Sequence, residues 1–128
     1  MTNTNEAVRS VNEGRGRYDL ISPEGERRLA IQYERGAKKF GERNWEKGHR
    51  WSRNIESARR HLNDYMAGDM SEDHLAAVAW QMFTLMHYEK YHPEFNDIPT
   101  RRVVEAVSPT IELEKEVYDA TGVVKDED

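Results

Sequence analysis

The segment from Ser71 to Lys90 constrains the fold most, because apolar residues surround nearly the whole of the helix that it predicts. Ser71 is suited to cap this helix, and Glu72 and Asp73 stand in its first turn, where the helix dipole favours acidic side chains. A helix that is apolar all round needs neighbours to bury it. The sequence therefore predicts a buried central helix with other elements packed around it.

Two further amphipathic helices precede this segment. Ser22 and Pro23 predict the start of the first, which ends near Gly41, and Ser52 is the expected cap of the second, which Gly68 closes. Weaker helical signals follow at Arg101 to Val107 and Pro109 to Ala120. Because the sequence shows no strand-like alternation of useful length, we expect an all-α bundle of about four helices with an extended N-terminal lead-in.

Length and composition predict one domain and an oligomer. The 128 residues suffice for one domain, which we place at 16–120, between a mobile N-terminal segment, 1–15, and an acidic tail, 121–128. Only 37% of the residues are apolar and 34% are charged, so a monomer would bury a thin core. We therefore expect a homo-oligomer, either a dimer or a tetramer.

Net charge and residue usage argue against several classes of protein and of binding site. The formal net charge of −5 argues against a general binder of nucleic acid or membrane surfaces. The absence of cysteine excludes disulfides and thiolate metal sites. No apolar run is long enough to span a membrane, and the first residues lack the pattern of a signal peptide. We therefore expect a cytoplasmic protein.

Polar residues gather in one sector of the central helix. Asp73, Gln81 and Thr84 share this sector, with His74 at its margin and the small Ala77 beside them. Burying such groups without partners costs on the order of several kcal/mol, so they are hydrogen-bonded, paired or coordinated to an ion. Two interpretations stay open with about even weight. Asp73 could bind a metal, or it could only stabilise the helix start while Gln81 bonds to a neighbouring helix.

The stretch from Tyr33 to Gly48 combines cations, glycines and an aromatic residue. Its five positive residues include Lys38, Lys39, Arg43 and Lys47, and they flank Asn44 and Trp45. This composition is typical of either a solvated basic loop or a site for a triphosphate.

Further carboxylates and histidines allow two interpretations each. Glu56 with Arg60, and Glu34 with Lys38, are helix-face ion pairs by default, but Glu34, Glu56 and Asp73 could together hold a hard cation such as Mg²⁺. His61 and His74 come from different helices without metal-binding spacing, which favours structural roles for both.

Four blocks, in order along the chain, carry a family resemblance: GRYDLISPEG, YERGAKKFGERNWEKG, SARRHL and EDHLAAVAWQM. Together they resemble the phage and prophage dATP/dGTP diphosphohydrolase domain, which includes the MazZ-type enzymes and is similar to the MazG-like all-α pyrophosphohydrolases. The resemblance covers about residues 14–92. It implies an oligomeric helical enzyme that depends on Mg²⁺ or Mn²⁺ and cleaves a purine (d)NTP to the (d)NMP and pyrophosphate, with dGTP or GTP as the first expectation for the substrate and dATP as the second.

The candidate residues give a hypothesis for the mechanism, and the resemblance implies a cellular setting. Glu34, Glu56 and Asp73 would be the catalytic metal ligands, with His61, His74 and Gln81 beside them. The phosphates would be bound by Lys38, Lys39, Arg43, Lys47 and Arg60, and the purine by Asn44 and Trp45. The product dGMP would supply phage nucleotide metabolism in an infected or lysogenic bacterium.

The sequence departs from the MazG pattern of acidic pairs. Glu56 has Arg59 three residues on, Asp73 has Ala76, and no ExxE occurs. The metal ligands must therefore be assembled differently. Two alternatives to the enzyme interpretation remain: a non-catalytic helical module that binds a nucleotide or a host protein, and a pyrophosphohydrolase that removes another dNTP.

Overall fold

The computed structural model describes residues 7–9 and 13–101. The chain divides into two compact units, Met1–Leu20 with Val107–Asp128, and Ile21–Ala106. In the described part of the first unit, a 3-10 helix, Tyr18–Leu20, lies beside an ion pair between Arg17 and Asp19. The predicted lead-in therefore contains a turn and is not extended throughout.

Three α-helices form the described part of the second unit: α1, Pro23–Phe40; α2, Trp51–Met66; and α3, His74–Tyr91. Short 3-10 helices follow α1 and α3, at Asn44–Lys47 and Pro93–Phe95. In the described residues there is no strand, which confirms the all-α class. The helical signals predicted after Arg101 lie outside the described residues.

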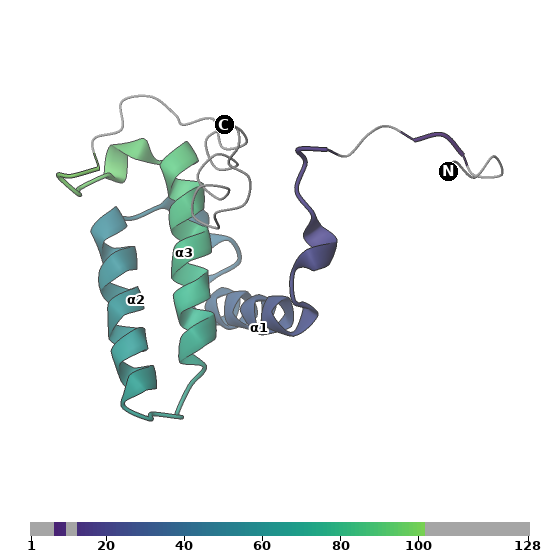
Figure 1. Ribbon diagram of the computed structural model, residues 1–128. Coiled ribbons are helices and arrows are strands. Elements are labelled where there is room, and N and C mark those ends of the chain that lie inside the picture. The colour runs from purple at the N-terminus through teal and green to yellow at the C-terminus, as the bar shows by residue number, and fades with distance from the viewer. Residues whose placement is uncertain (1–6, 10–12, 102–128) are drawn as a thin grey trace, which may run out of the picture. The chain divides into compact units, whose positions relative to one another are not determined.

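Helices α2 and α3 lie side by side and antiparallel, and α1 also packs against α3 (Figure 1). The buried apolar core is small and comes from α2 and α3: Trp51, Ala58, Ala76, Ala77 and Tyr88. Three polar side chains, Asn54, His74 and Thr84, are buried with it. The thin core predicted from composition is present in this unit.

The two ends of α1 lie where neighbouring residues in the sequence predict them. Ser22 caps α1 by accepting a hydrogen bond from the Gly25 amide at 3.1 Å, as predicted. Gly41, at a φ of 104°, ends the same helix. Both termini depend on residues adjacent in sequence.

Two predicted caps are wrong. The cap of α3 is Asp73, whose side chain accepts from the Ala76 amide, while the Ser71 hydroxyl donates to Asp69 instead. In α2, Ser52 already lies inside the helix, and its amide and hydroxyl donate to Asp97 at 2.9 and 2.6 Å. In both places an acidic side chain accepts the hydrogen bond, because a charged acceptor is the stronger partner.

The central position of α3 is confirmed, but its burial is incomplete. Leu75, Phe83 and Met86 are 40%, 50% and 58% exposed. At about 100° per residue they fall within roughly 80° of one another, so they share one face of α3. In the described part of the chain, no helix is long and apolar enough to cross a membrane.

Candidate functional site

A pocket of about 1120 Å³ lies along the stretch that the sequence singled out. Most of its wall comes from residues between Ala30 and His49, and α2 and α3 contribute the rest: His61, Ala77, Trp80 and Gln81. The volume is slightly above the usual range for small-molecule sites, which reaches about 1,000 Å³. The basic stretch is therefore part of a concave surface that two other helices complete.

The loop between α1 and α2 is held in place by the end of α3. The Tyr88 hydroxyl donates to the Trp45 carbonyl at 2.5 Å, and His92 Nε2 lies 2.6 Å from the Glu46 carbonyl oxygen. Burial, and next the neighbouring Tyr33, raise the pKa of Tyr88 to about 12, so its hydroxyl stays protonated as a donor. These bonds fix the backbone that carries Trp45.

Aromatic rings form one side of the pocket. The Trp45 ring lies 5.6 Å from Tyr33 and 4.8 Å from His87, edge to face in both cases. Tyr33 also contacts Trp80 at 5.9 Å between ring centres. Trp45 is half-buried in this cluster and lines the pocket, as does the predicted base-binding residue Asn44. Trp80 was not predicted, because its position on an apolar helix indicated core.

Cations form another part of the wall. Of the predicted phosphate-binding residues, Lys39, Arg43 and Lys47 line the pocket, and Arg35 joins them without having been predicted. Arg43 also pairs with Glu46. Lys38 is not in the wall and stands 3.9 Å from Glu34.

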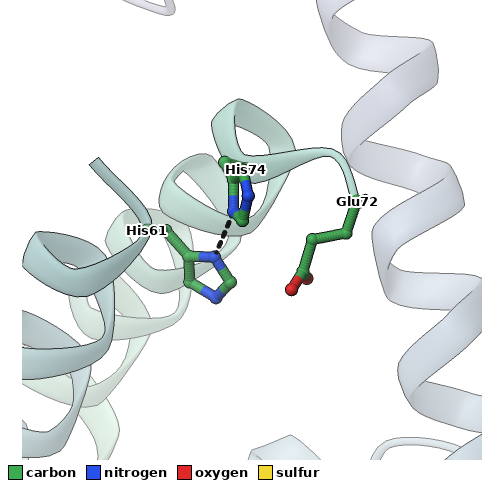
Figure 2. Close-up of side chains that lie close together, drawn as sticks. All are labelled: His61, Glu72 and His74. Atoms are coloured by element: carbon green, nitrogen blue, oxygen red, sulfur yellow. Dashed lines mark hydrogen bonds between the residues drawn. The ribbon is translucent and has the colours of Figure 1, made fainter. Parts of the chain in front are cut away.

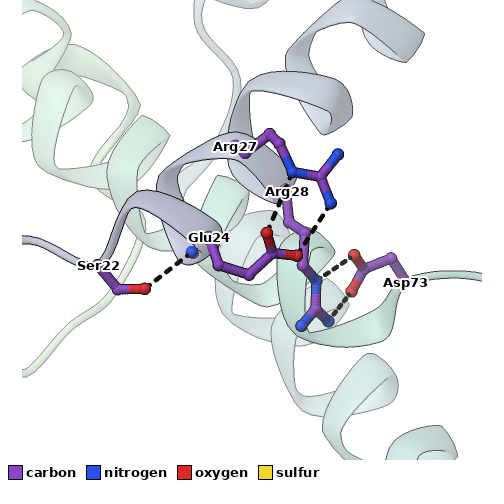
Figure 3. Close-up of polar contacts among 6 residues, drawn as sticks. Ser22, Glu24, Arg27, Arg28 and Asp73 are labelled. Carbon is purple, nitrogen blue, oxygen red and sulfur yellow. Dashed lines mark hydrogen bonds and ion pairs between the residues drawn. The ribbon is translucent and has the colours of Figure 1, made fainter.

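Asp73 has strong partners within the fold. Its two carboxylate oxygens accept bonds from the Arg28 guanidinium at 2.7 and 2.8 Å, which ties the start of α3 to α1 (Figure 3). The Arg28 hydrogen bonds lower the pKa of Asp73 to about 2. The interpretation in which Asp73 stabilises the helix start is thus observed, and sequence reasoning missed Arg28.

Glu56 and Arg60 lie elsewhere. They make a 3.4 Å ion pair and line a second, smaller pocket of about 550 Å³ on α2, together with Arg59. Glu34, by contrast, is in the wall of the large pocket. The structure thus places these two carboxylates in different hollows.

The three predicted metal ligands are therefore not brought together. Across residues 7–9 and 13–101, the group of three possible ligands whose donor atoms converge is His61, Glu72 and His74. Glu34, Glu56 and Asp73 do not form such a group, so their metal-binding role stays a prediction.

The histidine pair is the main site feature that sequence reasoning underestimated. His61 Nδ1 and His74 Nδ1 lie 2.9 Å apart, and the Glu72 carboxylate points toward the two rings (Figure 2). Asp69 holds His74 from the other side, with Oδ2 2.5 Å from Nε2. The Ser71 hydroxyl and then the His74 ring lower the pKa of Asp69. No short-range spacing indicates this cluster, because antiparallel packing of α2 and α3 creates it.

Gln81 is used to join helices. Its side-chain amide donates to the Ser57 hydroxyl at 3.0 Å, while its backbone carbonyl accepts from the buried Asn54 at 3.2 Å. The alternative in which Gln81 bonds to a neighbouring helix is thus the one observed. Gln81 still lines the pocket, at some distance along α3 from His74.

Comparison with known proteins identifies a family. The family model described as dATP/dGTP diphosphohydrolase, N-terminal, matches residues 5–98. This range includes all three described helices and every residue of the pocket wall. No curated protein and no solved structure matches the chain.

Proposed function

Because this chain belongs to the dATP/dGTP diphosphohydrolase N-terminal family, we propose that its large pocket binds a purine deoxynucleoside triphosphate and hydrolyses it. Water would attack phosphorus and the bond between the α-phosphate and the β-phosphate would break, which gives the dNMP and pyrophosphate. We propose dGTP as the preferred substrate and dATP as the second.

One observation carries the proposal: the pocket joins aromatic rings and cations within one wall. Tyr33, Trp45 and Trp80 offer apolar ring surface for a purine, as base-stacking sites in proteins do. The cations Arg35, Lys39, Arg43 and Lys47 would offset the charge of a triphosphate and of the pyrophosphate that leaves. The aromatic rings would thus contact the base of a nucleotide, and the cations would contact its triphosphate.

A divalent ion, Mg²⁺ or Mn²⁺, is part of this proposal. When bound, such an ion neutralises phosphate charge and lowers the pKa of a water molecule. Glu34, Glu56 and Asp73 do not fit one ion as they stand, since they lie in different hollows or are paired. The chain's own contribution is to bind and orient the triphosphate along the cationic wall.

The test is product analysis with the full chain. Incubation with dGTP, dATP, dCTP or dTTP and Mn²⁺ should yield dNMP and pyrophosphate in equal amounts, fastest with the purines. The proposal would be overturned if the products were dGDP and phosphate, or inorganic triphosphate and the free deoxynucleoside, or if no product formed. Binding of dGTP without turnover would favour the non-catalytic module instead.

Variants locate the reaction. Lys39→Gln and Arg43→Gln should each lower kcat/KM for dGTP about tenfold or more, because each removes a cation from the wall. Arg59→Gln is a matched control, since Arg59 lines the smaller pocket on α2. An equal loss in the control would place the reaction elsewhere.

We also propose that the protein is a homo-oligomer through the exposed apolar face of α3. Leu75, Phe83 and Met86 share that face, and the buried core is too small to leave them as incidental exposure. Light scattering after gel filtration should give the mass of a dimer or tetramer. Phe83→Glu should give the mass of a single chain, whereas the control Arg53→Glu, at an exposed position of α2, should keep the wild-type mass. A monomeric wild-type chain contradicts this part.

A further inference from the structure

The side chains of His61, Glu72 and His74 form a cluster whose ion binding can be measured without nucleotide. It joins the middle of α2 to the turn before α3 and to the first residue of α3. Its three donor atoms, two imidazole nitrogens and one carboxylate oxygen, all lie within 4.8 Å of one another. From these side chains we propose that the chain binds one divalent first-row transition metal ion here, such as Mn²⁺, Co²⁺ or Zn²⁺, in preference to Mg²⁺.

The ring of His74 is already oriented as a ligand. Its side chain is only 2% exposed, and its Nε2 is held 2.5 Å from Asp69 Oδ2, which is itself bonded to the Ser71 hydroxyl. A carboxylate that accepts the Nε2 proton leaves a lone pair on Nδ1. Metal-binding histidines usually have such a partner on the other nitrogen, which fixes the tautomer and raises the basicity of the ligand.

The second nitrogen ligand would be Nδ1 of His61, which faces Nδ1 of His74. His61 Nδ1 lies 2.9 Å from His74 Nδ1, so one proton is shared between them in the metal-free chain. Two nitrogens on one tetrahedral ion stand roughly 3.3 Å apart, given metal–nitrogen bonds of about 2.0–2.1 Å. If the two Nδ1 nitrogens moved a few tenths of an ångström further apart, an ion could take the place of the shared proton. The proton would then move to Nε2 of His61.

Glu72 supplies the third donor. Its side chain is exposed and makes no hydrogen bond within the described part of the chain, so it can rotate toward the ion without breaking a contact. Figure 2 shows its carboxylate directed toward the histidine rings. A carboxylate with two imidazoles suits a transition ion, whereas Mg²⁺ prefers oxygen ligands and water.

The cluster borders the large pocket through one residue. His61 belongs both to this cluster and to the wall of the large pocket. Three protein ligands also leave at least one coordination position open, which is typical of catalytic sites and not of closed structural ones. The ion would therefore be bound at the edge of the pocket.

The test measures metal binding without nucleotide, so it does not depend on turnover. The full chain, with any histidine tag removed, is titrated with Co²⁺ in a calorimeter while visible absorption of the bound ion is recorded. We expect one ion per chain at micromolar affinity or better, displacement by Zn²⁺, and no displacement by millimolar Mg²⁺. Binding only at millimolar Co²⁺, or equal displacement by Mg²⁺, would overturn the proposal.

Variants assign the ligands. His61→Ala should weaken Co²⁺ binding at least 100-fold, and Glu72→Gln and Asp69→Asn about 10- to 100-fold each. The control His87→Gln, outside the cluster, should bind as the wild type does. Circular dichroism of each variant checks that the helices form. A folded His61→Ala variant that binds Co²⁺ with unchanged affinity refutes the site.

Discussion

At the scale of single residues, Asp73 serves two elements at once. It caps α3 and makes a bidentate pair with Arg28 of α1. Asp73→Ala removes both contacts and should lower the free energy of unfolding by about 1–2 kcal/mol, as loss of a cap does. Urea denaturation at pH 7 measures this, and Glu24→Gln, which removes an exposed pair with Arg27, serves as control.

The same residue predicts how stability depends on pH. The pKa of Asp73 falls from 3.8 to about 2 in the folded chain, so its contribution to stability is complete above about pH 5 and is lost as the pH falls toward about 2. The difference between wild type and Asp73→Ala should therefore shrink over that range. A difference that stays constant between pH 5 and pH 2 would mean that the carboxylate charge is not the source of the stability.

Two glycines with similar backbones offer a matched comparison. Gly41 and Gly48 have φ values of 104° and 88° with extended ψ, a conformation that is essentially restricted to glycine. A Cβ on Gly48 would stand 2.8 Å from His92 and 2.9 Å from Phe95, whereas one on Gly41 meets nothing within 4 Å. Gly41→Ala should cost about 1–3 kcal/mol of backbone strain. Gly48→Ala should cost more, and equal melting temperatures for the two would contradict the packing described.

At the scale of elements, the start of α2 depends on a residue far along the chain. Asp97 accepts from both the amide and the hydroxyl of Ser52. Asp97→Ala removes both hydrogen bonds and should lower the midpoint of urea denaturation more than Ser52→Ala does. Ser52→Ala keeps the hydrogen bond from the backbone amide of residue 52 to Asp97. The reverse order would show that Ser52 caps the helix itself.

The helices also show what the sequence could predict at this scale. Apolar spacing and local signals such as Ser22 and Gly41 located all three described helices, because these signals act between neighbours in the chain. Local signals could not predict the contacts of Asp97 and Asp73. Each of these acceptors meets a partner 45 residues away, Ser52 and Arg28 respectively, and the sequence alone leaves both a metal-binding role and a role at the helix start open for Asp73.

At the scale of the whole molecule, the pocket was partly predictable and the histidine cluster was not. The composition of Tyr33 to Gly48 indicated phosphate and base contacts, and this stretch does line a pocket. His61 and His74 looked unrelated because they are on different helices, and only antiparallel packing places their rings side by side. Trp80 is typical of a core residue in the sequence, because a position on an apolar helix does not show which face of that helix a pocket reaches.

The central claim is that this pocket binds a purine nucleotide, and the three tryptophans test it directly. Trp45 and Trp80 line the pocket, whereas Trp51 is 3% exposed and donates its indole N–H to the His92 carbonyl. The indole signals of the ¹⁵N-labelled chain, assigned with Trp→Phe variants, are followed during titration with a dGTP analogue that cannot be cleaved between the α- and β-phosphates. We predict that the Trp45 and Trp80 signals shift together and that the Trp51 signal stays. No shift at saturating analogue, or a shift of Trp51 alone, would contradict the account.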